Sequence, residues 1–107
     1  MKYIGHLKYD DAISHSKGIV ICGGGEKLAN LVESLENRGI INKVLAIADR
    51  DKKKQGSFYK DIPIYSYEHI LQNYPRVAYI VYNQYAKEIC DYLFDEGVQE
   101  IHLYREV

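Results

Sequence analysis

The chain has only two cysteines, two prolines, one methionine and no tryptophan among its 107 residues. Cys22 and Cys90 are far apart in sequence, so they offer neither a disulfide framework nor the spacing of a zinc site, and we expect a reducing compartment. An excess of charge is also missing, because 14 basic and 15 acidic residues leave a net charge of −1. This balance gives no reason to expect bulk electrostatic binding to nucleic acid or to an anionic membrane.

A long apolar run is absent as well. Residues 1–17 mix Lys, His, Tyr and Asp with scattered apolar side chains, which argues against a signal peptide or a membrane anchor. We therefore expect a cytoplasmic protein without membrane insertion. With 47% apolar residues, 27% charged residues and no low-complexity tract, residues 1–107 are predicted to form one ordered domain.

Short β-rich runs alternate with helical periodicity, which is typical of βαβ units around a parallel sheet. Helices are predicted over 26–38, over 67–74 after an N-cap at Ser66, and from Asn83 to Gly97. Strands are predicted at 18–22, 43–48, 62–65, 77–82 and 100–105.

Right-handed crossovers between these strands favour a three-layer, Rossmann-like α/β fold. Its doubly wound parallel sheet of about five strands would have the order 3-2-1-4-5, with 62–65 at one edge and the last strand at the other. Residues 1–16 are expected to be an N-terminal extension, weakly helical over 9–16, that packs across the sheet.

Three glycines, Gly23, Gly24 and Gly25, separate the first predicted strand from its helix. In the dinucleotide fingerprint G-x-G-x-x-G, the first glycine makes the turn, the second admits phosphate and the third lets the helix pack closely. Gly23 and Gly25 fill the first two positions, but Leu28 stands at the third, which weakens a full-length NAD site. The turn predicts phosphate binding at a helix N-terminus, with a tight structural connection as the alternative.

Five other residues flank this predicted site. Glu26 suits the helix dipole but would repel a pyrophosphate, and Lys27 would offset that repulsion. Asp49 follows the last of the three glycines by 24 positions, close to the spacing for ribose hydroxyls, unless it caps the next turn. Arg50 would pair with phosphate or stack on a base, or else belongs to a solvated loop. Asn83 is either a ligand contact or a helix cap.

Three short segments resemble the small Rossmann-like domains of bacterial surface-polysaccharide synthesis enzymes. They are Gly23-Gly24-Gly25-Glu26; Ala46-Ile47-Ala48-Asp49 with a following Lys54-Gln55-Gly56; and Ile62-Pro63-Ile64 ahead of a helix that begins Tyr67-Glu68. Such domains precede the catalytic part of sugar-nucleotide dehydratases and sugar acetyltransferases, and similar ones accompany some glycosyltransferases and methyltransferases. The resemblance covers about residues 17–105.

This resemblance implies that Gly23, Gly24, Gly25 and Asp49 hold a nucleotide-sugar. A UDP-sugar or an NAD-type nucleotide would be the ligand. The chain stops without an acyltransferase repeat or a second catalytic domain, so it is expected to be a fragment of a longer enzyme or to work with a separate catalytic partner. No residue is predicted to be catalytic in the chain alone.

Three other functions compete with nucleotide binding. A structural or dimerising module with a degenerate site is one, since His102 and Tyr104 share a face of the last strand and an edge strand invites pairing. Cys22 before a glycine loop resembles the phosphocysteine of sugar-phosphotransferase B components, although the loop offers no Ser or Thr, and a buried structural cysteine is the alternative. A standalone oxidoreductase would lack its substrate-binding half. None of the histidines has metal-site spacing.

Overall fold

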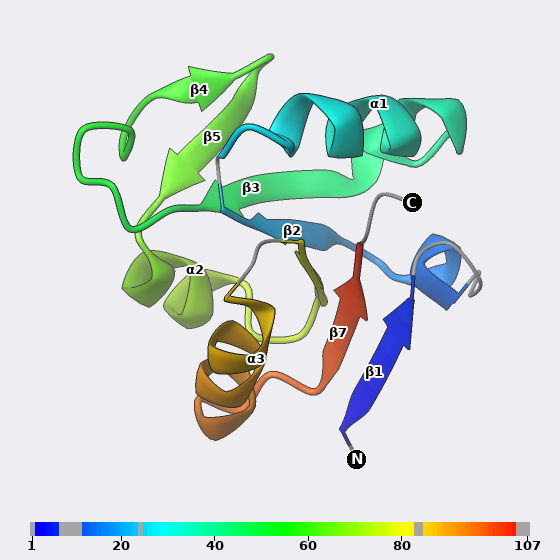
Figure 1. The fold of residues 1–107 in the computed structure, drawn as a ribbon, viewed down its shortest axis with the longest axis vertical. Helices are drawn as coiled ribbons and strands as arrows, with labels where there is room; N and C mark the ends of the chain where they lie inside the picture. Colours follow the sequence, from blue (N-terminus) through cyan, green and yellow to red (C-terminus); the bar gives the residue numbers. More distant parts are fainter. Residues whose placement is uncertain (1, 7–11, 24, 83–84, 105–107) are drawn as a thin grey trace.

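The computed structural model describes residues 2–6, 12–23, 25–82 and 85–104, and these form an α/β fold around one seven-stranded sheet (Figure 1). The strand order is β1-β7-β6-β2-β3-β5-β4, and every neighbouring pair is parallel except β4 with β5. The strands are β1 (Tyr3–His6), β2 (Ile19–Cys22), β3 (Val44–Ala48), β4 (Phe58–Tyr59), β5 (Ile62–Tyr65), β6 (Ala78–Val81) and β7 (Glu100–Leu103).

The strand order differs from the predicted 3-2-1-4-5, because the sheet continues by one strand at each end. The five predicted strands keep their relative order as β5-β3-β2-β6-β7, but neither β5 nor β7 is an edge. β4 pairs antiparallel with β5 through a turn in which Lys60 and Asp61 have φ of 45° and 69°. Positive φ at both central residues is the geometry of a tight two-residue hairpin, so the chain after β3 folds back on the sheet.

At the other end of the sheet, β1 pairs in parallel with β7. The last strand is therefore not open for pairing, and His102, which was considered for a pairing face if that face were open, is fully buried. The N-terminal residues were expected to pack across the sheet as a weak helix. Of the described N-terminal residues, Tyr3–His6 form the edge strand β1, which the sequence did not predict, and Ala12–His15 form the short 3₁₀ helix η1, with Ile13 fully buried in the core.

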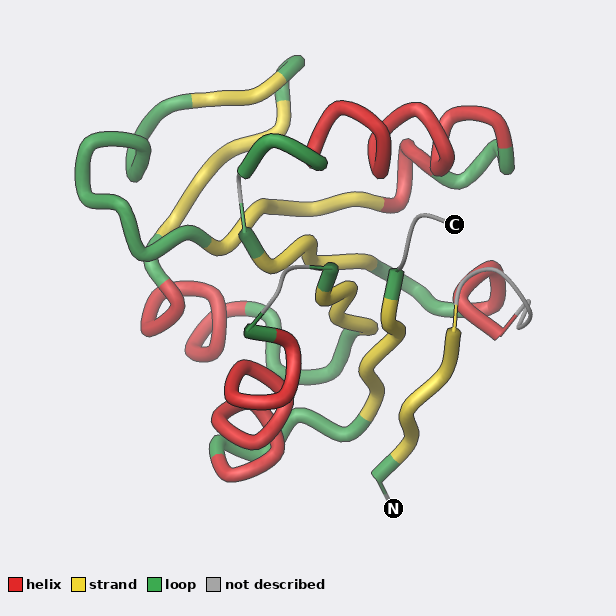
Figure 2. Tube along the Cα trace, in the orientation of Figure 1, coloured by secondary structure: helices red, strands yellow, loops and turns green. Residues whose placement is uncertain are grey.

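Helices cover both faces of the sheet. Figure 1 shows α1 (Leu28–Asn37) on one face and α2 (Tyr67–Asn73) with α3 (Ala86–Asp95) on the other, and the tube in Figure 2 shows the same three layers. A second 3₁₀ helix, η2 (Ile41–Lys43), leads into β3. Alternate residues of β2 point into two separate cores: Ile21 packs with the α1 side, and Cys22 packs with the α2 and α3 side.

The helix boundaries follow from local chemistry. Ser66 caps α2 as predicted, since its hydroxyl accepts a hydrogen bond from the His69 N–H at 3.1 Å. Gly39 and Gly97, at φ of 75° and 97°, follow α1 and α3. α1 begins at Leu28 rather than at Glu26, and the predicted helix start at Asn83 lies outside the described residues. No helix in the described ranges is long and apolar enough to cross a membrane.

Candidate functional site

The glycine turn lies at the point where the sheet changes its winding direction. β2 and β6 are parallel neighbours in register, with Cys22 beside Val81 at their carboxyl ends. After β2 the chain leads to α1 on one face, and after β6 it leads to α3 on the other (Figure 1). In open parallel sheets, ligands bind in the crevice outside the carboxyl ends of two such strands.

The turn itself bends sharply over the end of β2. Gly23 has a φ of 102°, a conformation that favours glycine, and its N–H donates to the Ala48 carbonyl at 2.7 Å. This bond joins the turn to the residue before Asp49, so the structure brings these two predicted binding segments together. Gly25 is exposed, and its carbonyl accepts a hydrogen bond from Leu28 N–H at 3.1 Å. Gly24 lies outside the described residues.

The side chain of Tyr82 occupies the inner side of this turn. Its hydroxyl donates to the Gly23 carbonyl at 2.6 Å, and Tyr82 is only 8% exposed. Burial raises the pKa of Tyr82, while a hydrogen bond from the Gly25 backbone N–H lowers it. A tyrosine oxygen thus contacts two backbone groups of the loop in which the sequence predicted a phosphate. No element of the dinucleotide fingerprint signals this residue.

Asp49 is at the carboxyl end of β3, where the sequence placed it, but its carboxylate already has partners. Oδ1 accepts from the Asp51 N–H at 2.9 Å, and Oδ2 lies 4.0 Å from the Lys54 ammonium. The carbonyl of Asp49 also accepts a hydrogen bond from the Gln55 side chain at 2.8 Å. With a side chain only 12% exposed, Asp49 shapes the loop after β3, which is the turn-capping role considered as its alternative.

The charged residues of the predicted site lie at its surface. Glu26 and Lys27 are exposed, and within the described residues neither forms an ion pair. The Arg50 guanidinium lies over the Tyr67 ring at 5.9 Å from its centroid, a cation–π contact that holds a positive charge at the carboxyl edge. Asn83 falls outside the described residues.

Cys22 has the environment of a structural thiol. It is fully buried, and its pKa is raised chiefly by that burial, although a hydrogen bond with Tyr67 opposes the rise. A nucleophilic cysteine needs the reverse, a lowered pKa and access to its substrate. The geometry therefore gives no support to a phosphocysteine mechanism. Cys90 is likewise buried, and no group of metal-ligating side chains occurs in the part of the chain that is described.

The carboxyl edge thus combines a glycine turn, an exposed lysine, an arginine held on an aromatic ring and an acid engaged in its own loop. These features suit an anionic ligand better than a metal ion or a covalent reaction. The resemblance to the polysaccharide-synthesis domains stays a prediction. No protein-family model matches this chain, and comparison with curated proteins and with solved structures gave no match.

Proposed function

We propose that this chain is an accessory module that binds a nucleotide or a nucleotide-sugar and serves a catalytic domain of carbohydrate synthesis, in the same polypeptide or in a separate one. The observation that carries the proposal is the position of the glycine turn at the switch point between β2 and β6. A ligand there would contact backbone amides at the start of α1, as phosphates do at a helix N-terminus.

The charge of this edge supports an anionic ligand. The N-terminus of α1 contributes its positive dipole end, worth about 0.3–1 kcal/mol toward an anion. Lys27 stands at the N-cap position, and Arg50 adds a second cation from the loop after β3. Glu26 opposes them, but it is exposed, so its side chain has room to turn away from the ligand.

Asp49 retains one oxygen for a ribose hydroxyl in this proposal. Its Oδ1 supports the loop through Asp51, whereas Oδ2 lies 4.0 Å from the Lys54 ammonium. The N···O distance of 4.0 Å is long for an ion pair and the Lys54 side chain is 45% exposed, so we expect this contact to be weak although the Asp49 side chain is only 12% exposed. In this proposal a ribose hydroxyl replaces it.

The second candidate is a structural or dimerising module with a degenerate site, and Tyr82 favours it. The Tyr82 oxygen already contacts the Gly23 carbonyl and the Gly25 N–H, so the protein itself supplies partners for the turn. In such a module, the turn is only a tight connection between β2 and α1.

Ligand-induced stabilisation separates the two candidates. A thermal-shift series with UDP-glucose, NAD and coenzyme A tests the intact chain, since a ligand at 100 times its Kd stabilises the folded state by about 2.7 kcal/mol. We expect a rise in Tm with UDP-glucose or NAD. No response to any of the three, together with a dimer that dissociates on dilution in light scattering, would favour the structural module.

Gly25→Ala locates the site without disturbing the fold. A Cβ at Gly25 meets no atom within 4 Å, and the residue has no positive φ, so the variant should melt like the wild type. The added methyl group would, however, keep a phosphate away from the backbone. We expect at least a tenfold loss of nucleotide affinity. Lys27→Ala should weaken binding as well, whereas Lys53→Ala, a matched loss of charge from the loop after β3, should not.

A further inference from the structure

Charge is unevenly distributed along this chain. Residues 50–61 carry five basic and two acidic side chains, a net charge of +3, whereas the other residues carry nine basic and thirteen acidic side chains, a net charge of −4. This segment, which we call the basic edge, comprises the loop after β3, strand β4 and the hairpin turn before β5. Figure 1 shows it at the end of the sheet that lies away from both termini.

Three lysines of the basic edge have no counter-charge beside them. Lys52, Lys53 and Lys60 are exposed, and none of them forms an ion pair with another residue of the described ranges. Lys54 differs, because its ammonium lies 4.0 Å from the Asp49 carboxylate. The three lysines are therefore available to an anionic partner.

An exposed phenylalanine stands between these lysines in the sequence. Phe58 is 69% exposed, and the next residue of β4, Tyr59, packs against the core on the α1 side. Successive side chains of a strand point to opposite faces, so Phe58 points away from that core. A single exposed aromatic is ordinary on a protein surface, but one flanked by lysines without ion pairs adds an apolar anchor to the charge.

The loop that carries two of the lysines is tied to the sheet. The Gly56 N–H donates to the Ile64 carbonyl at 2.8 Å, and the Ile64 N–H donates to the Ser57 carbonyl at 2.9 Å. Within the loop, the Lys53 N–H donates to the Asp51 carboxylate at 2.9 Å. The backbone is thus ordered before any partner arrives, which lowers the entropy cost of docking.

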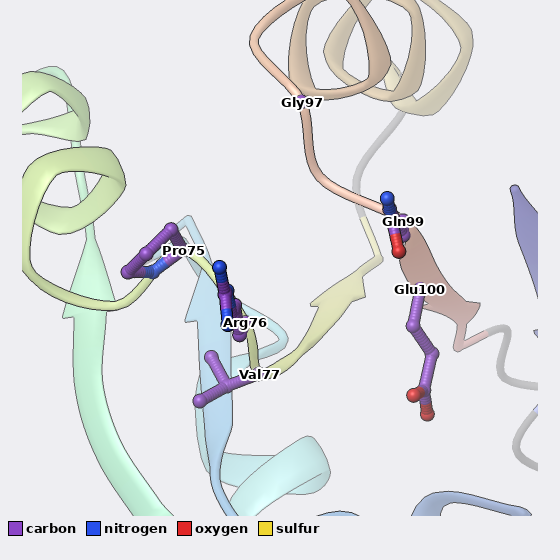
Figure 3. A pocket seen from close by; sticks show the side chains of 6 residues that line it. All are labelled: Pro75, Arg76, Val77, Gly97, Gln99 and Glu100. Carbon is purple, nitrogen blue, oxygen red and sulfur yellow. The ribbon is translucent and has the colours of Figure 1, made fainter. Parts of the chain in front are cut away.

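The cavity at the opposite edge of the strands lacks such an excess of one sign. It has a volume of about 490 Å³, lies where β6 and β7 begin, and is lined by one cation and one anion, Arg76 and Glu100. Figure 3 shows these two side chains pointing in different directions. The basic edge is therefore the stronger candidate for a further interaction.

The shape of the basic edge favours a flat partner. A standard protein interface takes about 20–30 residues a side, more than the twelve residues of this segment. Single-stranded nucleic acid stacks successive bases on several aromatic rings, whereas Phe58 is the one large hydrophobic side chain that is exposed in residues 50–61. An anionic bilayer needs only lysines near its headgroups and an aromatic ring at the interface.

We propose that the basic edge docks the protein reversibly on an anionic membrane surface. Lys52, Lys53 and Lys60 contact lipid phosphates and carboxylates, and Phe58 places its ring among the headgroups. The contact is peripheral, and it uses side chains other than those of the proposed nucleotide site.

Vesicle co-sedimentation tests the proposal with the intact chain. We expect binding to vesicles of phosphatidylcholine mixed with phosphatidylserine, weaker binding at higher salt, and none to phosphatidylcholine alone. An anionic surface contributes roughly a fivefold factor per lysine, so replacing Lys52, Lys53 and Lys60 together by Ala should weaken binding on the order of a hundredfold. The matched control replaces three exposed lysines outside the basic edge, Lys2, Lys17 and Lys87, and should retain most of the binding.

The aromatic anchor has its own pair of variants. Phe58→Ala should weaken vesicle binding at least fivefold, whereas Tyr85→Ala, which removes a ring that is 60% exposed at the start of α3, should not. All four variants alter exposed side chains, and their Tm values should stay near that of the wild type.

Several results would overturn the membrane contact. They are no binding to the mixed vesicles at low salt, equal binding to phosphatidylcholine alone, or equal losses in the two triple variants. Oligothymidylate and poly-L-glutamate serve as competing anionic probes. If either binds through the basic edge while the vesicles do not, the partner is a nucleic acid or an acidic polypeptide, and the proposal is wrong.

Discussion

The hydroxyl of Tyr82 is expected to stabilise the glycine turn, and Tyr82→Phe measures how much. The variant removes the donor to the Gly23 carbonyl and the acceptor for the Gly25 N–H, at a side chain that is 8% exposed. Leaving such a group unpaired costs about 1–3 kcal/mol. Gly23 is only half-buried and water can reach part of the turn, so we expect a value near 1 kcal/mol. A domain of about 100 residues loses roughly 4–8 °C in Tm for each kcal/mol.

Thermal melts followed by circular dichroism, together with urea titrations, give both quantities. Tyr92→Phe is the matched control, because the Tyr92 ring contacts Tyr67 while its hydroxyl makes no hydrogen bond with a described residue. We expect the control to melt within about 1 °C of the wild type. If Tyr82→Phe also does so, the contact between Tyr82 and the turn contributes nothing to stability, and the reasoning is refuted.

Three other measurements test the fold. Ser66→Ala should cost about 1 kcal/mol in a urea titration because α2 loses its N-cap, whereas Ser66→Asp should restore the stability. Gly97→Ala should lower the free energy of unfolding by about 1–2 kcal/mol, because alanine is strained at a φ of 97°. The Tm of this variant should therefore be lower than that of Gly25→Ala. Stability should also fall as the pH rises above about 8.5, because burial raises the pKa of Cys22 and of three tyrosines in the folded state only. The unfolded chain then loses protons that the folded chain keeps. Each group lowers the free energy of unfolding by about 1.4 kcal/mol per pH unit once the pH exceeds its ordinary pKa. A urea midpoint that stays constant from pH 7 to 11 would contradict this prediction. The three tyrosines are Tyr67, Tyr79 and Tyr82.

The sequence predicted the elements whose signals are local. The α1 helix has apolar residues at three- and four-residue spacing, all buried on one face, and Ser66 is followed by α2 as an N-cap should be. The two edge strands were missed because their residues carry weak signals. β4 has only two residues inside a polar loop, and β1 is exposed at every residue except Gly5, so it lacks the alternation of a half-buried strand. Their pairing with β5 and β7 depends on the whole sheet.

The candidate site was predictable only where one segment defines it. The glycine turn and the position of Asp49 after a strand follow from adjacent residues. The contact between Tyr82 and Gly23 joins residues 59 apart and exists because β6 lies beside β2 in register. Asp49 accepts a hydrogen bond from the Asp51 N–H because of how the loop folds, and Cys22 is buried because helices pack against β2. Residue type left two roles open for each of these residues, and the tertiary structure favours one of them.

At the carboxyl edge, a ligand must displace contacts that the protein already makes. The Tyr82 hydroxyl donates to the Gly23 carbonyl and also forms a hydrogen bond with the Gly25 backbone, so an anion at the turn competes with this side chain. Tyr82→Phe should therefore raise nucleotide affinity several-fold, by about 1 kcal/mol. Isothermal titration with UDP-glucose measures this, and an unchanged or lower affinity would show that Tyr82 does not compete with the ligand.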